Sequence, residues 1–215
     1  MLCQLKPKAE FFFSFARDLT RRLATVILCE GKTDTTLLKT LISKAGIEVT
    51  KSVGITDCEG VSSLEQVAAY TATLARISRR LKEIVLIVDA NEHTPGQRFQ
   101  SLMNSLRANQ VEIEGEEIIS EYVYKAIIPN SVLLVKIAGI LDLPFRKHMI
   151  EDYAVLLLIL NGEVKENELT LSSSAKEFLD RYGRDMISII EESEREKVQQ
   201  AFSNIIELLK LVVAE

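Results

Sequence analysis

The chain has 215 residues, of which 47% are hydrophobic and 27% are charged, and its formal net charge at pH 7 is −5. This length and apolar content suffice for a sizeable core in one domain, or in one domain with an appendage. The negative charge argues against a strongly basic nucleic-acid-binding protein, although an acidic enzyme site can still meet nucleic acid through a metal ion.

The three cysteines are Cys3, Cys29 and Cys58, and they show no spacing typical of metal ligands. Because Cys29 lies inside a run that predicts a buried strand, we expect reduced thiols in a reducing compartment. The phenylalanine-rich run at residues 11–15 is too short for a signal-peptide core, and the apolar run at 156–160 is far shorter than a membrane span. These features together predict a cytoplasmic protein.

Residues 9–22 predict an amphipathic helix, with its phenylalanines on the core side and arginines toward its end. The next unit begins with a run of apolar and β-branched residues at 25–29, which predicts a strand buried on both faces. The run stops at Glu30 and Gly31, and Thr33 is expected to cap the helix that follows. Glu30 is the first candidate site residue, because open α/β sheets place their ligands at the carboxyl ends of the strands.

A second strand is expected at residues 47–55, followed by an acidic turn that contains Asp57 and Glu59. If this strand neighbours the first, these two carboxylates extend a metal site. Solvated turn residues are the favoured interpretation, because turns favour such side chains without any ligand.

A helix over residues 62–77 opens with a capping box and is followed by a basic stretch that contains Arg79 and Arg80. Basic residues in this place suit the negative end of the helix dipole, which explains them without a ligand. A contact with a phosphate backbone is the alternative that stays open.

The third strand is expected at residues 84–88 and is followed by Asp89, while Thr94 and Gln97 form a capping box at the start of the next helix. Two parallel neighbours that end in carboxylates would bring Glu30 and Asp89 to one edge of the sheet. Such a pair suits Mg²⁺, which usually takes one or two protein carboxylates and keeps water or phosphate oxygens in its other positions.

Residues 117–128 alternate between apolar and polar side chains, which predicts a fourth strand nearer the edge of the sheet. The expected fold class is α/β, with a mostly parallel four-stranded sheet flanked by helices. Beyond residue 129 the pattern becomes helical, with helices expected over 132–141, 145–160, 174–182 and 192–213. We therefore predict an α/β domain at 1–129 and a helical C-terminal extension at 130–215, packed on that domain or on a second copy of the chain in a homo-oligomer.

Two motifs resemble those of the Toprim family, which topoisomerases, bacterial primases, recombination-repair proteins and OLD-type nucleases share. The first is Glu30-Gly31-Lys32-Thr33-Asp34 after a hydrophobic strand, and the second is Asp89-Ala90-Asn91 after another. The likeness spans roughly residues 23–128 and is greatest to small archaeal Toprim-like proteins. It implies phosphoryl transfer or phosphodiester cleavage on nucleic acid, with Mg²⁺ or Mn²⁺ as cofactor.

The resemblance implies that Glu30 is the general acid or base and that Asp89 is the first metal ligand. Asp34 matches an extra aspartate of the primase-like version of the domain. Asn91 stands where the family has a second aspartate, and because an amide brings no negative charge, the affinity for Mg²⁺ should fall. Glu92 is the neighbouring carboxylate available to replace it.

Four basic residues are the candidates for contacts with nucleic acid, namely Lys32, Arg79, Arg80 and Arg98. His93 and His148 are expected at the surface, because neither has a second histidine or cysteine at metal-ligand spacing. Glu151 and Asp152 resemble a late acidic motif of some Toprim relatives, but a solvated helix face is the favoured interpretation.

Two functions of different classes follow from these observations. The first is a Mg²⁺-dependent enzyme, nuclease-like or primase-like, with Glu30 moving a proton and Asp89 holding the metal. The second is a non-catalytic module that binds nucleic acid or protein and has kept the fold with a degenerate metal site, as Asn91 and the negative net charge suggest. An intact metal site that acts on a small phosphorylated molecule is a third, weaker alternative.

Overall fold

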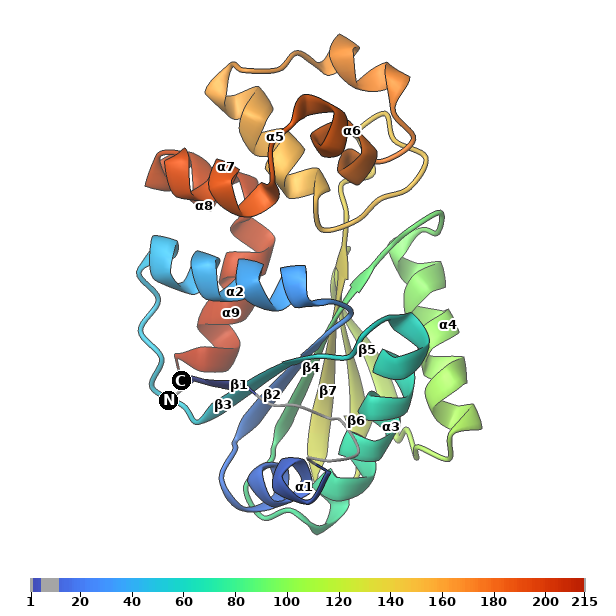
Figure 1. Cartoon of the computed structure of the whole chain (residues 1–215). Coiled ribbons are helices and arrows are strands. Elements are labelled where there is room, and N and C mark those ends of the chain that lie inside the picture. Colours follow the sequence, from blue (N-terminus) through green and yellow to red (C-terminus); the bar gives the residue numbers. More distant parts are fainter. Residues whose placement is uncertain (1, 5–11, 215) are drawn as a thin grey trace.

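The computed structural model of the protein describes residues 2–4 and 12–214. Its strands are β1 (Leu2–Gln4), β2 (Thr25–Cys29), β3 (Val53–Asp57), β4 (Glu83–Asp89), β5 (Gly115–Ser120), β6 (Val123–Ile128) and β7 (Ser131–Ala138). They form one seven-stranded sheet in the order β1-β3-β2-β4-β7-β6-β5 (Figure 1). Strands β1, β3, β2, β4 and β7 run parallel, whereas β6 and β5 continue the sheet in antiparallel fashion. The α/β class and the mostly parallel sheet are confirmed, but the expected number of four strands is wrong.

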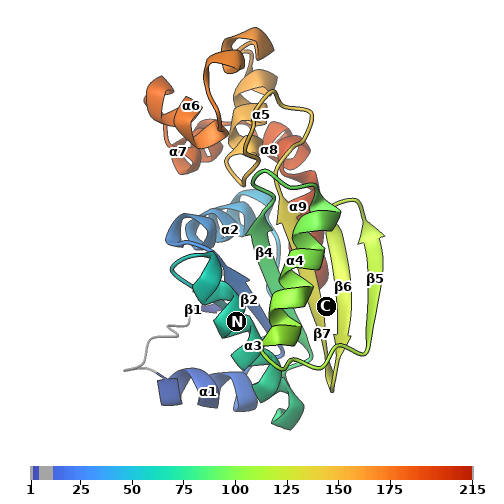
Figure 2. The same ribbon diagram turned by 90° about the vertical axis from the view of Figure 1, so that its right-hand side faces the viewer.

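The helices are α1 (Phe12–Arg21), α2 (Lys32–Ala45), α3 (Val61–Ile77), α4 (Pro95–Ala108), α5 (Asp152–Asn161), α6 (Ala175–Tyr182), α7 (Met186–Glu192), α8 (Arg195–Ala201) and α9 (Ser203–Val213), with a 3₁₀ helix at Glu166–Leu171. Helices α1, α3 and α4 cover one face of the sheet, and α2 and α9 cover the other (Figures 1 and 2). Helices α5 to α8 gather beyond the carboxyl ends of the strands. Among the described residues, none of the helices combines the length and the apolar character that crossing a membrane requires.

The N-terminal helix α1 contacts α3 through the aromatic side chain of Phe15. Residues 9–11 of the expected helix lie outside the described residues, as do the side chains at 12–14. Phe15 is buried and stacks on Tyr70 of α3, with ring centroids 6.4 Å apart. This contact agrees with the expectation that the phenylalanines of this helix serve burial.

Strand β7 replaces the helix that the sequence predicts over residues 132–141. It pairs with β4 along its length on one side and with β6 on the other. A strand buried on both faces is a continuous apolar run, which periodicity alone does not separate from a buried helix. Lys136 adds to the ambiguity, because a lysine is rarely expected inside a buried strand. The structure buries it fully, with its Nζ 4.8 Å from the Tyr122 ring centroid, and burial lowers its pKa to about 7. The sheet therefore continues past the boundary expected at residue 129.

The single strand predicted over 117–128 is a hairpin of β5 and β6. The register between these strands shifts between Ile118 and Ser120, and the side chains of Ile118 and Ile119 are both exposed. The alternating pattern of the sequence therefore describes β6, while β5 is an edge strand with two exposed faces.

Two further boundaries differ from prediction. Strand β3 begins at Val53 and not at residue 47, because Ile47 and Val49 pack on the core from an irregular connection. Helix α3 starts after Gly60 without a side-chain cap, so the capping box expected there is wrong.

The N-terminal caps of α4 and α2 can be compared with those that the sequence predicts. In α4, Thr94 Oγ1 accepts the Gln97 N–H at 3.3 Å and Gln97 Oε1 accepts the Thr94 N–H at 3.0 Å, which confirms the predicted capping box. In α2 the N-cap is Gly31 and not Thr33, and Asp34 Oδ2 accepts the Gly31 N–H at 2.9 Å. Asp34 is therefore turned back toward the end of β2.

The C-terminal helices are shorter and more numerous than predicted. The helix expected over 192–213 is divided at Phe202 into α8 and α9. The helix expected over 145–160 begins only at Asp152, and residues 139–151 form an irregular connection between β7 and α5. This β7–α5 connection lies at the carboxyl ends of the strands.

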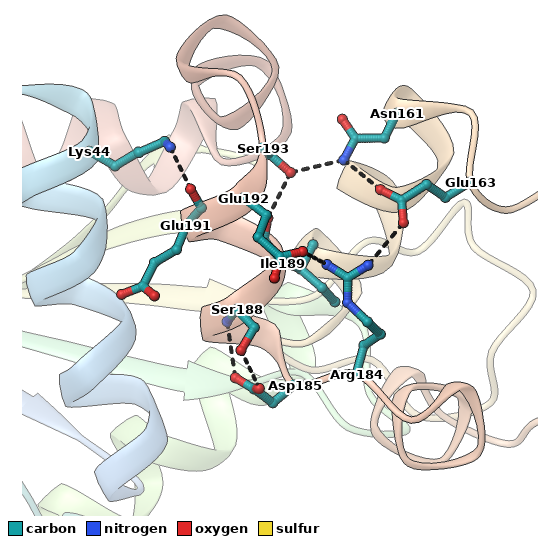
Figure 3. A network of polar contacts seen from close by, with 10 residues as sticks. All are labelled: Lys44, Asn161, Glu163, Arg184, Asp185, Ser188, Ile189, Glu191, Glu192 and Ser193. Carbon is teal, nitrogen blue, oxygen red and sulfur yellow. Dashed lines mark hydrogen bonds and ion pairs between the residues drawn. The ribbon is translucent and has the colours of Figure 1, made fainter.

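Polar contacts tie this helical part together and to α2, as Figure 3 shows. Arg184 pairs with Glu163 at 3.1 Å and also with Glu192. Lys44 Nζ at the end of α2 donates to the Glu191 carbonyl at 2.9 Å. Helix α7 is thereby held beside the C-terminal end of α2.

Candidate functional site

Glu30 and Asp89 lie side by side at the carboxyl edge of the sheet. Strands β2 and β4 pair directly and in parallel, with Cys29 opposite Ile87, so their ends reach the same edge. The Asp89 N–H donates a hydrogen bond to Glu30 Oε1 at 3.2 Å. The structure thus brings the two principal sequence candidates together.

A cavity of about 330 Å³ opens at this pair. Besides Glu30 and Asp89, its lining contains three further carboxylates and one basic residue: Asp34, Glu59, Glu151 and Lys176. Glu59 belongs to the acidic turn after β3, which neighbours β2, and it therefore reaches the cavity edge. The cavity collects carboxylates from turns that are far apart in the sequence but adjacent in the sheet.

The pKa values of four carboxyl groups in the cavity are raised above their ordinary values. Burial raises the pKa of Asp89 well above its ordinary value of 3.8, and Glu30 and Asp34 raise it further. Burial also raises the pKa of Glu30, which the Asp89 N–H and Arg98 partly offset. The pKa values of Asp34 and Glu151 are raised by burial as well, and Asp34 adds to the effect on Glu151. Like charges at close range and low exposure are the physical cause, and a proton or a cation relieves them.

Arg98 supports the pair from behind. It is buried, its Nη2 lies 3.6 Å from Glu30 Oε1, and its Nε donates to the Asp89 carbonyl at 3.1 Å. Arg98 therefore holds Glu30 in place. The sequence led us to expect Arg98 on a surface that contacts nucleic acid, but the structure buries it.

The β7–α5 connection closes the other side of the pair. The Ile150 N–H donates to Asp89 Oδ1 at 2.9 Å. Asp152 Oδ2 accepts the Ile140 N–H at 2.9 Å and lies 3.0 Å from His148 Nδ1. Asp152 is fully buried and His148 nearly so, which overturns the predicted solvated positions of both. This buried pair fixes the loop that presents the Ile150 N–H to Asp89 and Glu151 to the cavity.

Gly139 permits the close approach of this connection to itself. Its φ is +132°, a conformation that L side chains rarely adopt, and a Cβ on it would come within 2.7 Å of the His148 Cβ. The connection therefore needs glycine at this position to seat His148 against Asp152.

Asn91 and Glu92 point away from the cavity. Asn91 has a left-handed backbone with φ 56°, and it exchanges backbone hydrogen bonds with His148 at 2.7 and 2.9 Å. Its Nδ2 donates to the Asp89 carbonyl at 3.5 Å, and Glu92 is exposed and pairs with Arg146 at 3.5 Å. Neither lines the cavity, so the structure does not bring these two predicted ligands into the cavity beside the Asp89 side chain.

The family model described as "Protein of unknown function (DUF3226)" matches residues 24–200. The chain belongs to the DUF3226 family. The match runs from the start of β2 into α8, so the DUF3226 unit includes both acidic strand ends, the β7–α5 connection and α6. No curated protein and no solved structure matches the chain.

The described residues around the cavity do not form a complete set of metal ligands. Within residues 2–4 and 12–214, no three His, Cys, Asp or Glu side chains are grouped closely enough to hold an ion by themselves. A cation that needs only one or two carboxylates, with the remaining positions taken by water or phosphate oxygens, still fits the donor set. Hard oxygen donors without histidine or thiolate suit Mg²⁺ or Mn²⁺ better than zinc.

The other basic candidates lie elsewhere. Lys32 is the exposed first residue of α2, and it does not line the cavity. Arg79 and Arg80 precede β4 and therefore lie at the amino edge, the opposite end of the sheet from Asp89. Of the cations near the site, Lys176 of α6 reaches the cavity, and it also lines a neighbouring cavity of about 410 Å³ that shares Thr33 and Glu151.

Sequence reasoning favoured a solvated helix face for Glu151 and did not consider Lys176, yet both line the cavity. The one sequence signal for Glu151 was the likeness to a late acidic motif, because Glu151 follows the end of β7 by thirteen residues and the strand end alone does not place it. Lys176 has no comparable signal, because its place depends on how α6 packs over the strand ends.

Proposed function

We propose that the protein is a Mg²⁺-dependent or Mn²⁺-dependent enzyme of the Toprim type that acts on phosphodiester bonds of nucleic acid in a nuclease-like or primase-like reaction. The observation that carries this proposal is the direct hydrogen bond between Asp89 and Glu30 at the ends of adjacent parallel strands, inside a cavity with further carboxylates. Buried carboxylates that repel one another cost stability, and a divalent cation shared with a substrate phosphate offsets that cost.

Asp89 is the residue best placed to hold the cation. Its Oδ1 accepts the Ile150 N–H, which orients the carboxylate that would hold the cation. Asp34 and Glu151 line the same cavity and supply further oxygens. When bound, the cation neutralises charge on the phosphate and orients it for attack.

Glu30 serves as the general acid or base. Burial raises the pKa of Glu30, and a carboxyl group whose pKa lies closer to the working pH accepts and releases a proton more readily. Arg98 fixes its orientation from the buried side. Lys176, which also lines the cavity, contributes positive charge toward which a substrate phosphate is drawn.

The test is a cleavage assay on single-stranded and duplex oligonucleotides in Mg²⁺ or Mn²⁺ with Glu30→Gln. We expect the rate to fall by about 100-fold or more, the usual contribution of a positioned general acid or base. Glu92→Gln is the matched control, because Glu92 is exposed and lies outside the cavity, and its rate should stay near that of the wild type. Circular dichroism checks that Glu30→Gln is folded, since it removes the charge partner of Arg98. Equal rates for Glu30→Gln and the wild type would reject the role.

A non-catalytic binding module is the second candidate, and one observation favours it. Asn91 stands where the Toprim pattern has a second aspartate. Its side chain bonds to the Asp89 carbonyl, and it contributes no charge to the cavity. Absence of cleavage by the wild type in both metals, together with retained oligonucleotide binding, would support the module.

A further inference from the structure

Three arginines converge at the amino edge of the sheet, away from the acidic cavity. Arg21 is the last residue of α1, and Arg79 and Arg80 lie between α3 and β4. Together with Thr20 and Ile77 they line a hollow of about 360 Å³, which we call the arginine hollow. Strand β4 runs from this edge to Asp89, its last residue, a distance of roughly 20 Å at about 3.3 Å per residue.

A buried hydroxyl holds the hollow together. Ser78 Oγ donates to the Thr20 carbonyl at 3.2 Å, and it accepts the N–H groups of Arg80 at 3.2 Å and Leu81 at 3.0 Å. Ser78 is 5% exposed, so this link between α1 and the loop before β4 lies in the protein interior. The backbone that carries the three arginines is therefore positioned by the fold.

Among residues 2–4 and 12–214, the arginines of the hollow lack the carboxylate partners that other cations nearby have. Neighbouring cations have carboxylate partners: Arg22 with Asp18 at 3.3 Å, Arg76 with Glu112 at 3.4 Å and Lys51 with Glu83 at 3.4 Å. In the part of the chain that the structure describes, the guanidinium groups of Arg21, Arg79 and Arg80 have no ion pair.

Three like charges around one hollow repel one another, and in a chain of net charge −5 this local excess is not a consequence of composition. Helix dipoles explain why basic residues suit the ends of α1 and α3, but they do not require that Arg79 and Arg80 turn toward the same hollow as Arg21.

We propose that the arginine hollow binds a phosphate group. Guanidinium groups match phosphate oxygens with paired, charge-assisted hydrogen bonds, and the exposed Ile77 beside them offers apolar contact to the group that carries the phosphate. This site needs neither a metal ion nor Glu30, so it goes beyond the function proposed for the acidic cavity. The phosphate belongs either to a nucleic-acid backbone or to a free phosphorylated molecule.

The test measures binding without divalent metal, in EDTA, for the wild type and the Arg79→Gln/Arg80→Gln double variant. The probes are a fluorescent single-stranded oligonucleotide, followed by anisotropy, and inorganic pyrophosphate, followed by calorimetry. We expect the double variant to bind at least about tenfold more weakly, because a hydrogen bond to a charged group contributes about 1.5–3 kcal/mol and 1.4 kcal/mol is tenfold. Lys197→Gln/Lys210→Gln, on α8 and α9, removes the same charge from residues that do not line the hollow and should bind within about twofold of the wild type.

Each outcome decides the proposal. Oligonucleotide binding that the double variant loses supports a backbone phosphate, and pyrophosphate binding alone that the variant loses supports a small phosphorylated ligand. Binding of neither probe by the wild type, or equal loss in the double variant and the control, overturns the proposal. Because the measurement is made in EDTA, without the metal ion that the acidic cavity requires, its outcome is kept separate from that of the acidic cavity.

Discussion

The two edges of the sheet carry opposite charge in opposite environments. At the carboxyl edge, Glu30, Asp34 and Asp89 are partly or largely buried and are bonded to backbone N–H groups. At the amino edge, Arg79 and Arg80 are exposed and have no ion-pair partner among the described residues. The net charge of −5 conceals this separation.

Helix direction explains the signs but not the burial. In a parallel α/β layer the helices start at the carboxyl edge and end at the amino edge, so their dipoles favour acidic residues at the first and basic residues at the second. Exposed arginines at helix ends cost little free energy. Buried carboxylates of like charge cost several kcal/mol unless something compensates them, so the carboxyl edge is where a functional reason is required.

The largest expected effect comes from the support of the acidic edge. Asp152→Ala should lower the free energy of unfolding by about 3 kcal/mol, because it leaves His148 and the Ile140 N–H without their buried partner. Urea unfolding measures the loss. Asp142→Ala, in the same β7–α5 connection but exposed, is the control and should stay within about 0.5 kcal/mol of the wild type. A loss below about 1 kcal/mol for Asp152→Ala would show that the connection does not depend on this pair.

The next effect has the opposite sign. Asp89→Asn keeps an oxygen for the Ile150 N–H but removes a buried charge, and it should raise the stability of the metal-free protein by about 1–2 kcal/mol at pH 7.5. Because the pKa of Asp89 is raised in the folded state, the folded protein binds more protons than the unfolded chain just above pH 3.8. The contribution of Asp89 is therefore most favourable in acid and declines as the pH rises through the raised pKa.

Urea unfolding between pH 4 and pH 8 measures this difference. The increase in the free energy of unfolding that Asp89→Asn gives over the wild type should shrink toward pH 4. At that pH the side chain at position 89 is uncharged in the folded state of both proteins. A gain that is independent of pH would contradict the assignment of the effect to the Asp89 charge.

The smallest effect belongs to the amino edge. Arg79→Gln/Arg80→Gln should raise the melting temperature by only about 1 °C at low salt, because exposed like charges repel weakly and are screened. Differential scanning calorimetry at low and high salt measures it, and the gain should vanish at high salt. A melting temperature lowered by several degrees would mean that these arginines have a structural role, and the contrast between the two edges would then be wrong.

The sequence predicted the strands that are buried on both faces, β2 and β4, because their apolar runs end abruptly at Glu30 and Asp89. It did not predict β7, because a run interrupted by Lys136 fits a helix as well as a strand. Glu151 was expected on a solvated helix face, whereas it lines the cavity beside Asp89. The position of Arg98 was not predictable either, because a basic residue near the start of α4 reads as exposed until the packing against Glu30 is known.

The most direct test of the acidic edge is calorimetric titration of the metal-free protein with Mg²⁺ and with Mn²⁺, for the wild type and for Asp89→Asn. A site built on Asp89 predicts one saturable binding event in the wild type that Asp89→Asn abolishes, while Glu92→Asn leaves it unchanged. No saturable binding by the wild type at millimolar metal, or equal binding by Asp89→Asn, would contradict it.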